Sequence, residues 1–330
     1  MGGANTTPRN FEASQVPDLR GRVFLITGAS TGLGLQTAKV LLQKNATVVI
    51  TSRSAQKGKD SVDALASSVP EGAAVAERVR HLVLSLDDFK SIRAAAEGFK
   101  ALDLPLHVLV NNAGVMMCPK LTTTDGLEYQ FGVNHVGHFL LTKLLFPTLA
   151  ANSTTATPSR VVTLTSSFHE KGPREGILFD DINWTTTPYD SGLAYGHSKF
   201  ANLVFSNELN KRAQARGAGE PAAAAVVCNA VHPGFVDTDL TRHKAAEFGI
   251  FGNAVLAIYK RARGALPVTD GALTQLYAAT SPSATAGGKF FIPIAAESEP
   301  FPGCPPITQE LSDRLWTLSE QLVGETFDVV

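Results

Sequence analysis

Short runs of apolar, mostly β-branched residues alternate along the chain with longer segments in which apolar residues recur every three or four positions. The short runs predict buried strands, and the longer segments predict amphipathic helices. Because strands that are apolar throughout are typical of parallel sheets covered on both faces, we expect a doubly wound α/β fold of about seven strands. The expected strands lie at 22–28, 46–53, 79–86, 106–114, 160–167, 224–234 and 289–293, and the main helices at 34–45, 88–99, 127–149, 194–215 and 307–324.

This alternation continues almost to the C-terminus of the 330-residue chain without a linker rich in Pro, Gly or Ser. We therefore expect residues 1–20 to be an N-terminal extension and residues 21–330 to form one domain rather than two. Neither the extension nor any later segment has an apolar run long enough for a signal peptide or a membrane anchor. The sequence thus predicts no transmembrane segment.

Charge and cysteine content narrow the choice of partners and compartment. A net charge of −1 gives no electrostatic reason to expect nucleic acid as a partner. Cys118, Cys228 and Cys304 are sparse and lack the spacing of metal ligands, which predicts an intracellular, cytoplasmic protein. His135 and His138 lie one helical turn apart, but no carboxylate or thiolate has suitable spacing, so we expect no metal.

A glycine-rich stretch, "TGASTGLG" (27–34), joins the first expected strand to the first helix. Glycine permits a tight turn and the close approach of a pyrophosphate, and the helix N-terminus offers unpaired N–H groups to it. A tight strand-to-helix connection without a ligand is the alternative. The stretch predicts a dinucleotide cradle formed by Gly28, Ser30, Thr31, Gly32, Leu33 and Gly34.

The end of the second expected strand, "VVITSRSAQKGKD", bears on which dinucleotide binds. NAD-binding proteins usually place an acidic residue there, whereas NADP-binding proteins place an arginine near the 2′-phosphate. This chain has Arg53, followed by Lys57, and no acid at the strand end. A solvated basic loop is the alternative, but the pattern favours NADP(H) over NAD(H).

Tyr195 and Lys199 lie four positions apart in "YGHSK" on a predicted helix. Residues with this spacing are neighbours on any helix, so a surface pair is one interpretation. The other is that an ammonium near the phenol lowers its pKa and makes Tyr195 a proton donor and acceptor near neutral pH.

Several motifs occur together in an order that resembles the short-chain dehydrogenase/reductase family: "TGASTGLG", "NNAG" (111–114), "TSS" before "YGHSK", and "HPGFVDT" (232–238). The resemblance covers the chain from about Gly21 to Gly324. The long segment between Ser167 and Tyr195, together with "GVNHVGHFLLT" and "LWTLSEQLVG", resembles the retinol dehydrogenase branch, with protochlorophyllide reductases as more distant relatives.

The resemblance implies a set of catalytic roles. Tyr195 would be the general acid for carbonyl reduction or the general base for alcohol oxidation, and Lys199 would bind the nicotinamide ribose and lower the Tyr195 pKa. Ser167 would hold the substrate oxygen, with Ser166 as the alternative, and Asn134 would position a water behind Lys199. Hydride transfer develops negative charge on a carbonyl oxygen, which two aligned hydroxyl donors would stabilise.

The resemblance also implies further cofactor contacts. The family's usual Asp at the end of the third strand is replaced by Ser85, so the adenine contact is either weaker or supplied by Asp87. The remaining contacts fall on Asn111, Ala113 and Gly114 for the adenosine and ribose side, and on Pro233, Gly234, Val236 and Thr238 for the nicotinamide and phosphates.

A substrate lid is expected at 239–268, followed later by the C-terminal helix at about 307–324. Phe168, Trp184 and Tyr189 would add a wall from the segment before Tyr195. Ordinary core packing explains part of this apolar character, but the composition favours a lipophilic or aromatic substrate. The apolar residues of the lid are Phe248, Ile250, Phe251, Val255, Leu256, Ile258 and Tyr259.

Together these features predict an NADP(H)-dependent oxidoreductase that interconverts an aldehyde or ketone and its alcohol. A double-bond reductase on the same scaffold and a non-catalytic NADP-binding sensor or scaffold are the alternatives. The complete set of Asn134, Ser167, Tyr195 and Lys199 favours carbonyl chemistry. The helices at 127–149 and 194–215 correspond to those through which the family commonly forms homodimers, although a monomer is compatible with the sequence.

Overall fold

Eight strands form one sheet in the computed structural model, which describes residues 10–69, 73–217, 225–236 and 264–329. The strand order is β3-β2-β1-β4-β5-β6-β7-β8, and every neighbouring pair is parallel except β7 and β8. The expected doubly wound α/β fold is thus confirmed, with β8 as an additional antiparallel edge strand. The strands span Val23–Ile26 (β1), Thr47–Ser52 (β2), Val79–Val83 (β3), Val108–Asn111 (β4), Arg160–Leu164 (β5), Val227–Val231 (β6), Phe290–Ile292 (β7) and Ala296–Ser298 (β8).

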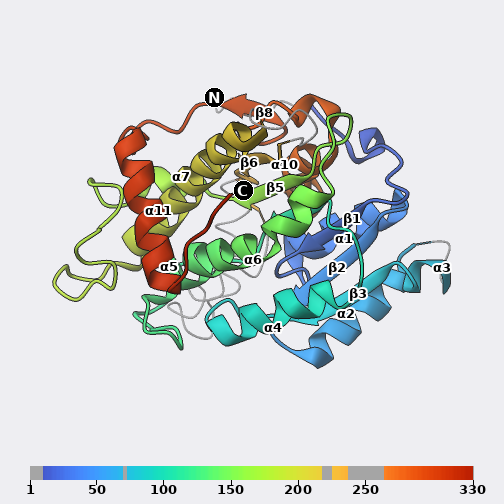
Figure 1. Ribbon diagram of the computed structural model, residues 1–330, viewed down its shortest axis with the longest axis horizontal. Helices are drawn as coiled ribbons and strands as arrows, with labels where there is room; N and C mark the ends of the chain where they lie inside the picture. The colour runs from blue at the N-terminus through green and yellow to red at the C-terminus, as the bar shows by residue number, and fades with distance from the viewer. Residues whose placement is uncertain (1–9, 70–72, 218–224, 237–263, 330) are drawn as a thin grey trace.

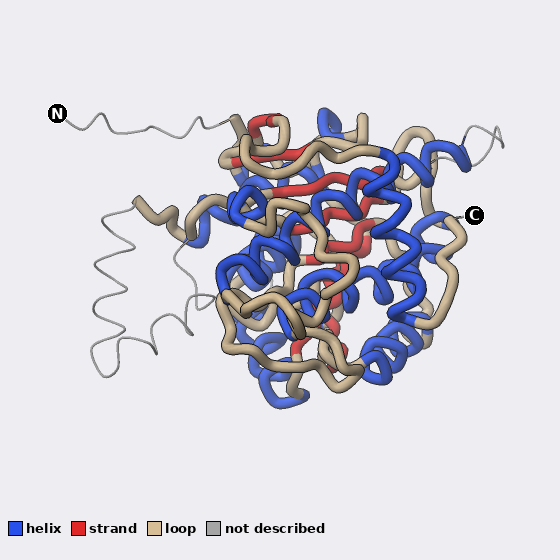
Figure 2. Tube along the Cα trace, turned by 90° about the vertical axis from the view of Figure 1, so that its left-hand side faces the viewer, coloured by secondary structure: helices blue, strands red, loops and turns tan. Residues whose placement is uncertain are grey.

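Helices cover both faces of this sheet (Figures 1 and 2). One buried cluster packs α4, α6, α7 and α11 against the sheet, and a second packs α1 and α10 against the opposite face. The helices span Gly32–Gln43 (α1), Ala55–Ser67 (α2), Ala73–Ala76 (α3), Phe89–Lys100 (α4), Tyr129–Phe131 (α5), Gly137–Ala151 (α6), Ser191–Gly217 (α7), Val268–Thr280 (α10) and Gln309–Val323 (α11).

Local sequence signals set where several helices begin and end. Ser54 and Asp88 accept hydrogen bonds from backbone N–H groups in the first turns of α2 and α4. Thr308 does the same for α11, which ends at Gly324 in a left-handed conformation. These side chains satisfy N–H groups that the helix itself leaves unpaired, whereas glycine permits the left-handed ending.

The C-terminal helix α11 covers the helices that the sequence nominates for a homodimer. Trp316 of α11 stacks on Phe205 of α7 at 6.1 Å and meets Phe139 of α6 edge-on at 5.3 Å. Phe327 follows α11 and packs on Phe139 and Phe146. These contacts bury the large apolar side chains of α6 and α7 within the chain itself, and the homodimer stays a prediction.

The parallel strands end at one edge of the sheet and place their following loops together there. β1 and β4 are hydrogen-bonded neighbours that lead to helices on opposite faces of the sheet. Folds of this type usually bind their ligand just outside the carboxyl ends of two such strands. The loops after β1, β2, β4, β5 and β6 carry most of the candidate residues. Within the described part of the chain, no helix is long and apolar enough to span a membrane.

Candidate active site

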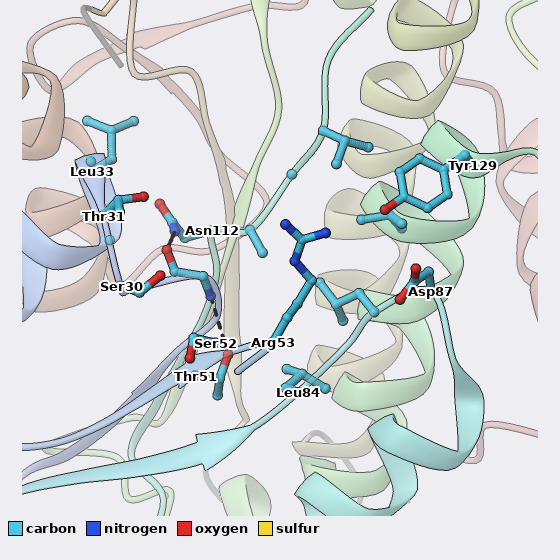
Figure 3. Close-up of a pocket in the computed structure, with 18 residues that line it drawn as sticks. Ser30, Thr31, Leu33, Thr51, Ser52, Arg53, Leu84, Asp87, Asn112 and Tyr129 are labelled. Atoms are coloured by element: carbon cyan, nitrogen blue, oxygen red, sulfur yellow. Dashed lines mark hydrogen bonds between the residues drawn. The ribbon is translucent and has the colours of Figure 1, made fainter. Parts of the chain in front are cut away.

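The glycine-rich turn after β1 forms one wall of a cavity at this edge of the sheet (Figure 3). Gly28 and Gly32 adopt positive φ angles of 64° and 56°, which favour glycine. A Cβ atom at Gly34 would stand only 2.8 Å from the Ala29 Cα and 2.9 Å from the Gly28 carbonyl oxygen. The cavity is lined by Gly28, Ser30, Thr31, Gly32, Leu33, Gly34, Thr51, Ser52, Arg53, Leu84, Leu86, Asp87, Asn112, Ala113, Gly114, Val115, Tyr129 and Val133.

Arg53 extends from the end of β2 into the cavity, with Asn112 on one side and Tyr129 and Asp87 on the other in Figure 3. Lys57, the second basic residue nominated from the sequence, lies exposed on α2 and is not among the lining residues. The basic character of the described cavity wall therefore comes from Arg53.

Asp87 lies where the adenine contact is expected, and the Ser85 hydroxyl donates a hydrogen bond to its carboxylate. Asp87 lines the cavity together with Leu84 and Leu86 from the same segment, whereas Ser85 does not. Alternation along extended backbone accounts for Leu84 and Leu86 facing the cavity while Ser85 does not, and the turn at residues 86–87 brings Asp87 to the same wall. Of the two alternatives for the adenine contact, the cavity wall offers the Asp87 carboxylate, and the contact itself stays a prediction.

Asn111 and Asn112 point in different directions after β4. The Asn111 amide donates to the Thr142 hydroxyl in α6 at 3.0 Å, so its side chain packs in the protein interior. The Asn112 amide instead donates to the Thr27 carbonyl oxygen at 2.7 Å, and Asn112 lines the cavity. The predicted Asn111 thus supports the loop, while Asn112, which the sequence analysis did not nominate, faces the cavity.

A buried chain of hydrogen bonds ties this loop to α6. The Thr27 hydroxyl accepts from the backbone N–H groups of Asn112 and Ala113, each at 2.9 Å. It lies 2.9 Å from His138 Nε2, and His138 Nδ1 lies 2.9 Å from the Asn134 carbonyl oxygen. Because a carbonyl only accepts, Nδ1 carries the proton and Nε2 accepts from Thr27. Burial lowers the His138 pKa to about 4, which keeps the ring neutral.

Asn134 lies in a π-helical turn, Gly132–Val136 (η2), between α5 and α6. Its side-chain oxygen accepts from Val115 N–H at 2.8 Å, and its amide donates to the Val115 carbonyl oxygen and the Ser198 hydroxyl, each at 2.9 Å. The side chain therefore fixes the loop after β4 against α7. Such π-helical turns are frequent at functional sites.

Tyr195 and Lys199 face the interior from α7 rather than the surface, with exposed fractions of 3% and 4%. The Lys199 ammonium donates to the Leu164 carbonyl oxygen at 3.1 Å and lies 5.8 Å from the centre of the Tyr195 ring. A Cβ atom at Gly114 would stand 3.5 Å from Lys199 Nζ, so this ammonium adjoins the cavity wall. The interpretation of the pair as a surface feature is thus wrong.

Burial dominates the electrostatics of this pair. It raises the Tyr195 pKa to about 12, although a hydrogen bond with the Ser166 side chain opposes the rise. It lowers the Lys199 pKa to about 7. The expectation that Lys199 brings the Tyr195 pKa towards neutrality is not met in this structure, because removing a charged group from water disfavours the charged form of both residues.

Ser166 is the serine that contacts the Tyr195 phenol. β5 ends at Leu164, and Ser166 caps the short 3₁₀ turn Ser167–Lys171 (η3), with its hydroxyl accepting from Phe168 N–H at 3.3 Å. A Cβ atom at Gly196 would stand 2.6 Å from the Phe168 carbonyl oxygen, so glycine beside Tyr195 permits this turn to approach α7 closely. The structure thus brings together Tyr195, Lys199 and Ser166.

The segment between Ser167 and Tyr195 contacts the residues at the start of α5. Tyr189 donates from its hydroxyl to the Cys118 carbonyl oxygen at 3.0 Å and accepts from the Gln130 amide at 3.1 Å. Glu128, buried nearby, accepts from Phe131 N–H at 2.7 Å, and burial raises its pKa. Phe168 lies beside Tyr195 with ring centres 5.7 Å apart, whereas Trp184 is fully buried.

The loop after β6 closes the same edge. Gly234 has a φ of 92°, and a Cβ atom there would stand 2.9 Å from side-chain carbons of Leu266 and Pro293. Pro233, Gly234 and Val236 do not line the cavity described above. Thr238 and most of the expected lid, through residue 263, lie outside the described residues. In the described part of the chain, no group of three or more His, Cys, Asp or Glu residues is arranged to hold a metal ion.

Comparisons with known proteins agree with the motifs. The sequence model of the short chain dehydrogenase family matches residues 22–178. The chain is 36% identical over 301 residues to short-chain dehydrogenase TIC 32 A, chloroplastic, of Brassica napus, covering 91% of this chain and 88% of that protein. It is 37% identical over 307 residues to retinol dehydrogenase 12 of Homo sapiens, covering 93% and 87%. A crystal structure of an uncharacterised protein from Mycobacterium paratuberculosis aligns with a TM-score of 0.71 and 32% identity, covering 96% and 98%.

Proposed function

Because this chain belongs to the short-chain dehydrogenase/reductase family, in its retinol dehydrogenase-like branch, we propose that it uses NADP(H) to interconvert a lipophilic or aromatic aldehyde or ketone and its alcohol. The observation that carries this proposal is the grouping of the buried residues Tyr195 and Lys199 with the half-buried Ser166 beside the glycine-lined cavity. The family makes the protein an oxidoreductase, and these residues supply the means to move a proton.

The cavity fits a dinucleotide. Gly34 leaves no room for a side chain because the start of α1 packs closely on the backbone of Gly28 and Ala29, and the N-terminus of α1 provides N–H donors for a pyrophosphate. Arg53 would pair with a 2′-phosphate through its guanidinium. Ala113 and Gly114 would contact the ribose side, and Lys199 would reach the nicotinamide ribose. The bound cofactor supplies the hydride.

Tyr195 would act as the general acid in carbonyl reduction. With a pKa of about 12, its phenol is protonated at neutral pH and can give its proton to the substrate oxygen as negative charge develops there. We assign the second hydroxyl donor to Ser166 in place of Ser167, because Ser166 contacts Tyr195. The Lys199 ammonium would favour the phenolate that forms after the transfer.

The preference for a lipophilic substrate is supported by an apolar side chain beside Tyr195. Phe168 packs beside the Tyr195 ring. An apolar wall with a few polar groups at the reacting centre is typical of small-molecule sites.

The test is the oxidation of NADPH and NADH, followed at about 340 nm, with a panel of aromatic, terpenoid and long-chain aldehydes and ketones. We expect turnover with NADPH, and loss of most turnover in Tyr195→Phe without loss of NADPH binding. Ser166→Ala and Ser167→Ala form a matched pair, in which Ser166→Ala should lower kcat by roughly 100-fold and Ser167→Ala should not.

Tight NADPH binding without turnover across the panel would instead support a cofactor sensor. Reduction of a conjugated double bond with the carbonyl left intact would support the other alternative. Full carbonyl reduction by Tyr195→Phe would contradict the proposed mechanism.

A further inference from the structure

His169 stands three residues after Ser166 in the η3 turn and is buried, with an exposed fraction of 1%. Its two ring nitrogens meet backbone groups from distant parts of the chain. Nδ1 lies 2.6 Å from the Ser166 carbonyl oxygen, and Nε2 accepts from Phe301 N–H at 3.0 Å. The imidazole therefore bridges the proposed catalytic serine and the loop that follows β8.

The two partners allow only one form of the ring. A backbone N–H only donates, so Nε2 must present its lone pair, and a carbonyl only accepts, so Nδ1 must carry the proton. Burial lowers the His169 pKa, against opposing contributions from the Ser166 hydrogen bond and the Glu170 charge. A neutral ring with its proton on Nδ1 satisfies both backbone groups at once.

The bridge fixes the backbone from which the Ser166 hydroxyl projects. The Ser166 carbonyl oxygen accepts from His169 N–H at 3.0 Å in addition to Nδ1. The Ser166 hydroxyl in turn accepts from Phe168 N–H. These three bonds constrain both the carbonyl and the hydroxyl of Ser166, and the hydroxyl lies beside the Tyr195 phenol.

The far side of the bridge is also anchored. Phe301 stacks on the His169 ring with ring centres 5.2 Å apart and planes inclined by 18°. Phe301 meets Phe290 of β7 edge-on at 5.7 Å and His232, which precedes Pro233, edge-on at 6.1 Å. The loop carrying Phe301 is thus packed against the sheet and gives the His169 ring a fixed support.

We propose that His169 is a positioning residue, which holds Ser166 in its reactive orientation by bridging the Ser166 carbonyl to the backbone of Phe301. This role rests on the proposed carbonyl chemistry at Tyr195 and Ser166. The positioning role depends on the two ring nitrogens of His169 and not on the volume of the ring. Variants that preserve the hydrogen bond of one nitrogen at a time can therefore distinguish this role from ordinary packing.

The experiment uses three variants of the full chain. The shorter amide of His169→Asn replaces Nδ1 and keeps a donor for the Ser166 carbonyl, and the longer amide of His169→Gln replaces Nε2 and keeps an acceptor for Phe301 N–H. His169→Phe keeps only a stacked ring. His107→Phe is the control, because His107 is a half-buried histidine before β4 that accepts from Val23 N–H at 3.0 Å, at the opposite end of the strands. Steady-state kinetics, NADPH affinity and amide hydrogen exchange are measured for each.

We expect His169→Phe to lower kcat by roughly 10- to 100-fold while the NADPH dissociation constant changes little, because a small displacement of a reacting group is costly. His169→Asn should recover most of kcat, and His169→Gln should not. In His169→Asn, amide hydrogen exchange should be faster than in the wild-type protein at residues 299–304 but unchanged at residues 166–171. In His169→Phe, it should be faster in both segments. His107→Phe should leave kcat and both segments unchanged.

Equal kcat values in the Asn and Gln variants, or exchange in both segments that matches the wild-type protein, would overturn the role of His169 and leave the proposed function intact. A wild-type protein that reduces no carbonyl compound would overturn the proposed function. In that case the exchange pattern still decides whether His169 bridges the two backbones, since it needs no turnover.

Discussion

Replacing Lys199 with methionine should stabilise the fold at pH 7, with an advantage that shrinks as pH rises. Burial lowers the Lys199 pKa to about 7 in the folded protein, whereas an exposed lysine titrates at about 10.4. Between these values the unfolded chain binds more protons, so the free energy of unfolding of the wild-type protein rises with pH. The free-energy cost of burying the Lys199 ammonium is therefore largest below pH 7, and it disappears above the pKa of lysine in the unfolded chain.

The magnitude follows from the two pKa values. A gap of about 3.5 pH units corresponds to a cost of about 4 kcal/mol at pH 7 and about 2 kcal/mol at pH 9. Lys199→Met removes this cost but also loses the hydrogen bond to the Leu164 carbonyl oxygen. That loss and any change in packing are nearly independent of pH, so they cancel when the two pH values are compared. The advantage of the variant should fall by about 2 kcal/mol between pH 7 and pH 9.

Urea unfolding followed by circular dichroism at pH 7, 8 and 9 measures this difference. Tyr195, with a pKa of about 12, stays protonated over this pH range and does not contribute to the change. Lys59→Met, at an exposed position on α2, is the control and should show the same pH dependence as the wild-type protein. Parallel stability curves for wild type and Lys199→Met would refute the argument that the ammonium is desolvated. Activity of the variant should be lost, which makes this lysine a case of stability given up for function.

Three further predictions concern the cavity and the buried carboxylate of Glu128, which precedes the lining residue Tyr129. Arg53→Ala should weaken NADPH binding by at least 10-fold and NADH binding little; equal losses in titrations with the two cofactors would remove Arg53 from the 2′-phosphate site. Gly34→Ala should abolish tight NADPH binding in the same titration, because its Cβ meets backbone atoms within 3 Å, whereas Gly98→Ala on α4 should bind normally. Glu128→Gln should lower the free energy of unfolding by about 1–3 kcal/mol in urea, since an amide N–H₂ would face a donor; an unchanged midpoint would contradict this.

Elements with a strong local pattern were predictable without the tertiary structure. The apolar runs at 22–28 and 46–53 gave β1 and β2, and the period of the segment at 88–99 gave α4. The helix α2 at Ala55–Ser67 and the strand β8 at Ala296–Ser298 were not anticipated. The buried face of α2 consists of Gly58, Ser61 and Leu65, so a single large apolar residue marks it in the sequence. β8 is only three residues long and pairs with β7, and α2 packs against β3.

The residues of the candidate site were likewise predictable only where a local sequence pattern marks them. The glycine turn and the spacing of Tyr195 and Lys199 are local features, and each lies where its spacing predicted. The choice between Ser166 and Ser167, or between Asn111 and Asn112, depends on where a strand ends and which way the next residue turns. Adjacent residues in extended backbone point to opposite sides, so an error of one position reverses the side chain.

What the sequence determined by itself is the α/β order of elements, the glycine turn and the Tyr195–Lys199 pair, because turn geometry and helical period act over only a few residues. The tertiary structure alone decided that burial raises the Tyr195 pKa and lowers that of Lys199. It also decided that His169 joins two loops separated by more than a hundred residues. Desolvation and long-range hydrogen bonding depend on which distant segments exclude water from a site, and only the packed chain fixes that.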